Sequence, residues 1–142
     1  MAGDSSLKMK ILKRDRLLLL LRLILLVIGV WVGWNQFRIA GKAIFVFRNN
    51  EPLSSWVFVL VGPMSVLPAS ILAVFEPKYG GTWLILGSII SSLALLAEVK
   101  ELSSAMYTLT HYTLPMFALG VFALIIWKTG QNRPQTGEED LH

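Results

Sequence analysis

His111 is the residue of this 142-residue chain with the most versatile chemistry, because an imidazole can ligate haem iron or carry a proton near neutral pH. A haem held by two histidines needs a second imidazole inside the same fold, but the other histidine, His142, ends a polar tail. Met106 and Met116 share the helix predicted around His111, so neither can reach the opposite axial position. We therefore expect no cofactor, and we keep haem or quinone binding at His111 as a minor alternative.

Arg22 is the one charge that lies well inside a long apolar stretch, Leu17 to Trp34. Charges within membrane-crossing helices are costly and often mark routes for ions or substrates. Arg22 follows Leu17 closely, however, so its long side chain can extend back along the helix to the lipid headgroups. We favour that interpretation and keep a role in transport as the alternative.

Pro63 and Pro68, with Gly62 beside the first, interrupt a second apolar stretch. Interrupted helices of transporters can bind ions through the carbonyls that proline leaves without a donor. Hydroxyls, here Ser65 and Ser70, can satisfy such carbonyls without any transport. No Asp or Glu lies at the middle of an apolar stretch, so the carboxylate relay of proton-driven carriers is missing. We expect a bent packing helix, with a small transporter or channel that uses this helix and the arginine above as the alternative.

Small residues recur one helical turn apart in two of the apolar stretches. Such stripes let helix backbones approach closely, which is how helices associate in lipid. We expect them to pack the helices of one bundle together, with contact to another subunit as the alternative. The residues are Gly29 and Gly33 in the first stretch, and Gly87, Ser88, Ser91 and Ser92 in the third.

Several kinds of chemistry have no support in the sequence. The chain contains no cysteine, which excludes disulfides, iron–sulfur clusters and thiol nucleophiles. We find no spacing of His, Asp and Glu typical of a metal site, no phosphate-binding glycine loop and no Ser/His/Asp arrangement. We therefore expect a protein that is not an enzyme.

Four long apolar stretches must position these residues. A bilayer core of about 30 Å needs roughly 20 helical residues, and 54% hydrophobic against 15% charged residues suits such a protein. We predict an all-α, polytopic membrane protein with one domain, residues 17–127, built as a four-transmembrane-helix antiparallel bundle. The predicted spans are about 17–36, 56–75, 80–98 and 105–127.

Positive charge predicts the orientation of the spans. Lysine and arginine are concentrated in the flank 1–16, and cytoplasmic flanks normally carry that excess. Trp34 and Trp56 then fall at outer ends of helices, where interfacial aromatic residues collect. Tyr79 and Trp127 fall at inner ends. We expect both termini in the cytoplasm.

The connections give more specific expectations. The segment 36–55 is favoured as an interfacial helix, with Arg38 and Lys42 one turn apart, although its residues 43–47 also suit a short strand. Residues 76–81 form a proline- and glycine-rich turn by composition, which makes a hairpin of the second and third helices.

The ends of the chain and the last helix complete the prediction. The last helix should begin near Ser103 or Ser104, either of which can cap it, and Pro115 should bend it. Gly130 should end it, leaving a disordered cytoplasmic tail at 128–142. Residues 1–6 are expected to fray before the first helix.

The leading hypothesis is a non-catalytic accessory or helix-packing subunit, or a small homo-oligomer. The net charge of +4 comes mainly from the flank 1–16, which should contact anionic lipid and not nucleic acid. The layout resembles that of small prokaryotic four-helix membrane proteins, which favours a multi-pass protein of a prokaryotic plasma membrane.

Overall fold

The structure is a computed structural model that describes residues 2–46 and 51–131, and every element within these two ranges is helical. Four helices are long and apolar enough to cross a membrane: Gly3–Phe45, Leu53–Phe75, Pro77–Glu98 and Leu102–Gln131. The predicted all-α fold with four such helices is therefore confirmed. In order, the elements are α1 (Ala2–Val46), α2 (Leu53–Val61), α3 (Pro63–Phe75), α4 (Pro77–Glu98), α5 (Leu102–Thr108), the π-helical turn η1 (Leu109–Thr113) and α6 (Leu114–Gln131).

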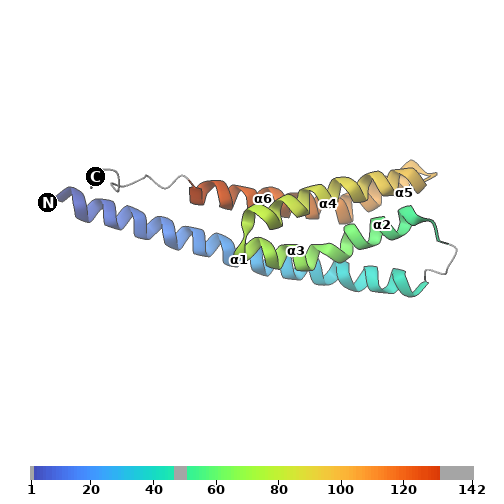
Figure 1. Cartoon of the computed structure of the whole chain (residues 1–142), viewed down its shortest axis with the longest axis horizontal. Coiled ribbons are helices and arrows are strands. Elements are labelled where there is room, and N and C mark those ends of the chain that lie inside the picture. Colours follow the sequence, from blue (N-terminus) through green and yellow to red (C-terminus); the bar gives the residue numbers. More distant parts are fainter. Residues whose placement is uncertain (1, 47–50, 132–142) are drawn as a thin grey trace, which may run out of the picture.

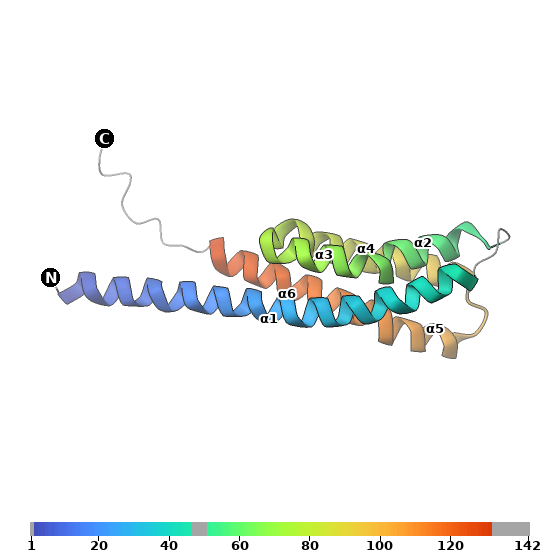
Figure 2. The same cartoon turned by 90° about the horizontal axis from the view of Figure 1, so that it is seen from below.

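The helices lie side by side in an elongated bundle (Figures 1 and 2). α3 packs against α1 on one side and against α4 on the other, and α4 also packs against α2 and α6. Beyond this bundle the N-terminal part of α1 extends past the ends of the other described helices (Figure 1). The core contains Leu25, Val66, Ala69, Ala73, Leu84, Met116, Leu119, Ala123 and Ile126.

α1 is one continuous helix, which corrects the prediction for the segment 36–55. Residues 36–46 continue the first helix and form neither a separate interfacial helix nor a strand, while 47–50 lie outside the described residues. The physical reason is that nothing between Gln36 and Val46 stops a helix that is already formed, since propagation adds one hydrogen bond for each residue fixed.

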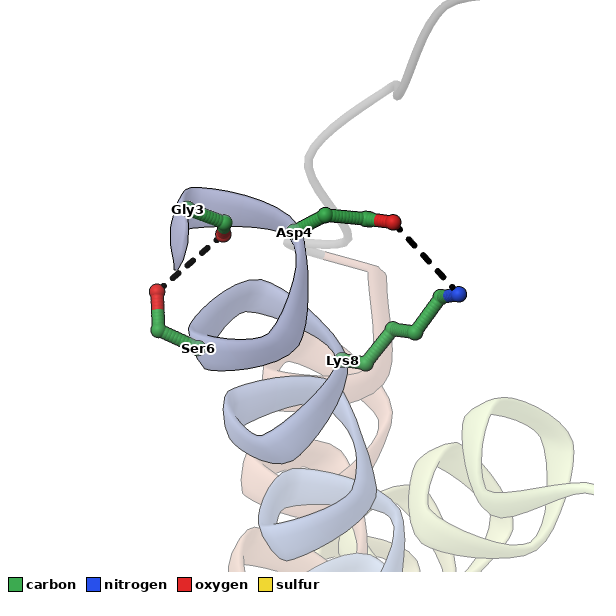
Figure 3. Close-up of polar contacts among 4 residues, drawn as sticks. All are labelled: Gly3, Asp4, Ser6 and Lys8. Carbon is green, nitrogen blue, oxygen red and sulfur yellow. Dashed lines mark hydrogen bonds and ion pairs between the residues drawn. The ribbon is translucent and has the colours of Figure 1, made fainter. Parts of the chain in front are cut away.

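The start of α1 is also more regular than predicted, because residues 2–6 are helical. Asp4 forms an ion pair with Lys8 at 3.5 Å, and the Ser6 hydroxyl donates to the Gly3 carbonyl at 3.1 Å (Figure 3). An acidic residue in the first turn suits the positive end of the helix dipole. Both contacts are weak and exposed, but each favours helix formation in a segment that the sequence predicts to fray.

The second apolar helix is divided at Gly62, which separates α2 from α3. Pro63 starts α3, and Pro68 lies inside α3 without ending it. The Ser65 hydroxyl bonds the carbonyls of Val61 and Gly62, the latter at 3.1 Å. A hydroxyl therefore satisfies backbone groups at the break, as is usual for proline-containing membrane helices.

The connection between α3 and α4 is shorter than predicted. Only Glu76 lies between the two helices, and Pro77 already begins α4. The predicted turn 76–81 is therefore wrong from Pro77 onwards. The glycines serve packing instead, since a Cβ on Gly80 would lie 2.3 Å from the backbone nitrogen of Ala73.

The last long helix begins at Leu102, close to the predicted start. Glu101 occupies the cap position and no side chain caps the helix, so the predicted serine cap is wrong. Gly130 lies inside α6, which continues to Gln131, so this glycine does not end the helix. Of the predicted disordered tail, residues 128–131 are helical and the remainder lies outside the described residues.

Candidate functional site

The most unusual feature of the bundle is the π-turn η1 (Leu109–Thr113) in the last long helix. The Leu114 amide donates to the Leu109 carbonyl five residues earlier, which is the π-helical pattern. Pro115 explains it, because proline has no amide hydrogen for the His111 carbonyl and its ring would clash with that carbonyl in a regular α-helix. Such π-turns are found frequently at functional sites.

Gln36 of α1 reaches this turn from the neighbouring helix. Its Nε2 donates a hydrogen bond to the Tyr112 carbonyl at 3.1 Å, and its side chain is only 4% exposed. The Gln36 Oε1 is buried without a hydrogen-bond partner. An unpartnered buried acceptor costs about 1–3 kcal/mol, so the Gln36 Oε1 lowers the stability of the bundle.

His111 is fixed by its own helix. Its Nδ1 lies 2.9 Å from the Tyr107 carbonyl, and its ring stacks on the Tyr107 ring with centroids 4.0 Å apart. A carbonyl oxygen can only accept, so Nδ1 carries the hydrogen and, in the neutral ring, Nε2 is left as an acceptor. His111 is exposed at the surface of the bundle.

A pocket of about 290 Å³ lies between α1 and the π-turn. Gln36 and His111 line it together with several aromatic rings. Its lining consists of Trp31, Val32, Asn35, Gln36, Ile39, Tyr107, His111, Tyr112 and Pro115.

A second pocket, of about 310 Å³, lies on the other side of the π-turn, against α4. The hydroxyls of Ser88, Ser92 and Thr110 that line it bond carbonyls of their own helices. The Thr113 Oγ1 is buried without a partner. The second pocket therefore offers fewer free polar groups than the first, and we take the first as the candidate site.

Arg22 lies away from both pockets. Gly29 is packed against Ser70, so Arg22, about two turns nearer the N-terminus, lies level with the connection between α3 and α4. It is exposed and forms no hydrogen bond or ion pair with any of the described residues. The break at Pro63 is about 20 Å away along the bundle. The structure therefore does not bring Arg22 and the prolines together into one site.

The small residues of the first stripe lie at helix contacts within the bundle. A Cβ on Gly29 would lie 2.8 Å from the Ser70 Cβ, and one on Gly33 would lie 2.8 Å from the Leu67 Cα. Both positions therefore allow α1 to approach α3 closely.

The small residues of the third stretch lie on α4. A Cβ on Gly87 would lie 2.7 Å from the Met116 Cε, so this glycine packs against α6. Ser88 and Ser91 are each 1% exposed, and Ser92 is half-buried. Contacts within the bundle therefore use most of the residues that could have bound another subunit.

The sequence identifies His111 as a candidate but gives no indication of Gln36 or Tyr112. The predicted span 17–36 places Gln36 at its outer end, where a polar residue needs no explanation, whereas the structure places Gln36 level with Gly62, near the middle of the second long helix. The available signal was Pro115, because an internal proline displaces backbone groups that another helix can satisfy. The sequence does not show which helix supplies the donor.

Among residues 2–46 and 51–131, no group of three or more His, Cys, Asp or Glu side chains could hold a metal ion. The candidate site consists of aromatic rings, an imidazole and carboxamides. Comparison with known proteins adds no assignment, since no family model, no curated protein and no solved structure matches this chain.

Proposed function

We propose that this chain is a non-catalytic accessory subunit of a prokaryotic plasma membrane, which acts by packing against another membrane protein or a second copy of itself. In this proposal the four long helices cross the bilayer as an antiparallel bundle with both termini in the cytoplasm. The contacts of Gly29 with Ser70 and of Gly33 with Leu67 support opposite directions for α1 and α3.

The observation that carries the proposal is the part of α1 that extends beyond the bundle (Figure 1). Leu7 and Ile11 lie on the same face of α1 as Leu18 and Leu25, which pack in the core, because these positions recur at helical spacing. Leu7 is 42% exposed and Ile11 is 40% exposed. The apolar stripe that holds the bundle together thus continues past it, where another helix can pack on it.

Charge on the same segment supports a place at the membrane surface. Lysine and arginine outnumber acidic residues in the first turns of α1, and each basic residue near an anionic leaflet contributes about 1 kcal/mol of attraction. The basic residues are Lys8, Lys10, Lys13, Arg14 and Arg16. Arg14 also bonds the Thr129 carbonyl, which ties this segment to α6.

The absence of cysteine permits a direct test. Ile11→Cys places a thiol on the apolar stripe, and Met9→Cys places one on the opposite face two residues away, as a matched control. In native membranes we expect a thiol crosslinker to join Ile11→Cys to a defined product, either a dimer or a complex with one other protein, and to leave Met9→Cys largely monomeric.

A monomer at both positions would overturn the proposal. Equal crosslinking at both positions would also contradict it, because it would indicate random collision in the membrane. Mass spectrometry of the product then separates a homo-oligomer from a complex with a different membrane protein.

A further inference from the structure

We propose that the pocket between α1 and the π-turn binds the head group of a lipid-soluble hydroquinone. This inference concerns a ligand, and it does not depend on the packing role proposed above.

Two acceptors of the pocket have no hydrogen-bond donor. The Gln36 Oε1 is an acceptor without a partner, and the Nε2 of neutral His111 is a second acceptor because Nδ1 is engaged by the Tyr107 carbonyl. Both residues line the same pocket. A ligand that pairs with both acceptors must bring two hydrogen-bond donors, and a hydroquinone carries two hydroxyl groups where the oxidised quinone carries two carbonyl acceptors.

The lining also favours a flat ring. Trp31, Tyr107 and Tyr112 line the pocket together with the imidazole of His111, and aromatic rings prefer to stack or to meet edge to face. The volume of about 290 Å³ is at the small end of ligand pockets, which range from roughly 300 to 1,000 Å³. It suits a single substituted ring.

The depth of the pocket favours a ligand that arrives through lipid. Gly33 lies against Leu67, and Gln36 follows Gly33 by about one turn, which places it level with the break at Gly62. That break is near the middle of the second long helix, Leu53–Phe75. A charged or water-soluble ligand would have to leave water to reach this depth, whereas a hydroquinone with an aliphatic tail is already dissolved in the bilayer.

Gln36 has two parts in this proposal. Its Nε2 holds the Tyr112 carbonyl, and so acts as a positioning group for the turn that carries His111. Its Oε1 is buried without a donor, so in this proposal the side chain shifts toward the pocket on binding and a hydroxyl of the ligand supplies that donor. Binding therefore removes the cost of an unpartnered buried acceptor.

The test uses the full-length protein in lipid nanodiscs and two probes, a decyl-substituted dimethoxy-methyl hydroquinone, kept reduced under anaerobic conditions, and its oxidised quinone. Binding is followed by calorimetry and by quenching of tryptophan fluorescence, since Trp31 lines the pocket. We expect the hydroquinone to bind more tightly than the quinone by about 3-fold or more, because only the reduced form supplies donors.

Variants locate the site. We expect His111→Phe to keep a ring in the pocket but to weaken hydroquinone binding by about 2- to 10-fold, as expected for one lost hydrogen bond. Gln36→Leu should have a similar effect and leave quinone binding less changed. Thr110→Val is the matched control, because Thr110 lines the pocket on the other side of the π-turn. Circular dichroism establishes that each variant is folded.

Three results would overturn the inference. The first is no binding of either probe, and the second is equal binding of the reduced and oxidised forms. The third is hydroquinone binding that folded His111→Phe and Gln36→Leu leave unchanged, or that Thr110→Val reduces as much. None of these results bears on the crosslinking of Ile11→Cys, so the two proposals succeed or fail separately.

Discussion

The side-chain amide of Gln36 donates to the backbone carbonyl of Tyr112 at 3.1 Å, joining α1 to the last long helix at its π-turn. The donor and the acceptor are 76 positions apart in the chain. Hydrogen bonds between membrane helices contribute about 0.6 kcal/mol on average, so this bond alone does not hold the bundle together. Its effect is to fix the register between two helices and the direction in which the π-turn presents His111.

Replacing Gln36 should lower the free energy of unfolding less when the new side chain fills the same space. We expect Gln36→Leu to lower the free energy of unfolding by about 1 kcal/mol or less, because it loses one hydrogen bond but also removes the unpartnered Oε1. Gln36→Ala should cost about 2 kcal/mol, because it also leaves a cavity. Unfolding in mixed micelles, followed by circular dichroism, measures both, and a larger loss for leucine than for alanine would contradict this account.

Two glycines of α1 should respond in opposite directions to alanine. Gly33→Ala places a Cβ 2.8 Å from the Leu67 Cα, and backbone cannot move aside cheaply, so we expect a loss of about 1–3 kcal/mol. Gly41 has nothing within 4 Å of such a Cβ, so Gly41→Ala should be neutral or stabilising by up to about 1 kcal/mol. The same unfolding measurement checks both, and equal effects would show that α1 and α3 are not in this contact.

Single cysteines should report the orientation of the bundle, since the chain has none of its own. We expect Lys100→Cys to react with a membrane-impermeant maleimide in intact cells, and Lys78→Cys to react only after the membrane is opened. Both side chains are exposed in the structure, so reaction depends on the side of the membrane. The opposite pattern would place both termini outside the cytoplasm.

Arg22 should be dispensable for folding. It is exposed and lies level with the connection between α3 and α4, and in the proposed topology its side chain can reach the headgroups there. We expect Arg22→Gln to change the free energy of unfolding by less than about 0.5 kcal/mol. Vesicles containing either form should show the same ion permeability as empty vesicles, and a flux that disappears in Arg22→Gln would instead support the transport alternative.

Hydropathy and the spacing of small residues predicted the coarse fold, because a helix that crosses lipid needs a long apolar stretch and close contacts between helices need small residues. Four apolar stretches of sufficient length became four helices, and the small residues at Gly29, Gly33 and Gly87 lie where helix backbones approach. The errors fell at boundaries. The segment 36–55 is predicted as a separate interfacial helix because Arg38 and Lys42 form a basic face, yet charge on the outer face of a helix does not interrupt its backbone hydrogen bonds.

The candidate site was predicted only in part, since His111 was identified and its surroundings were not. The pairing of Gln36 with Tyr112 depends on the register of two helices, which side-chain types along one helix do not specify. The formation of the π-turn also depends on how the neighbouring helices pack against it. Pro115 predicts a disturbed helix, but whether the disturbance becomes a bend, a break or a wider turn depends on which neighbour offers a donor.

The uninterrupted course of α1 has a consequence for anything that binds its first turns. At 1.5 Å per residue its 45 residues extend about 68 Å, more than twice the thickness of the hydrocarbon layer. Because each residue adds about 100° of rotation, inserting two residues between Ile11 and Leu18 would swing Ile11 to almost the opposite azimuth, whereas inserting seven would lengthen the helix and nearly restore its angular phase. The direction that Ile11 faces is thus set by side chains anchored several turns away.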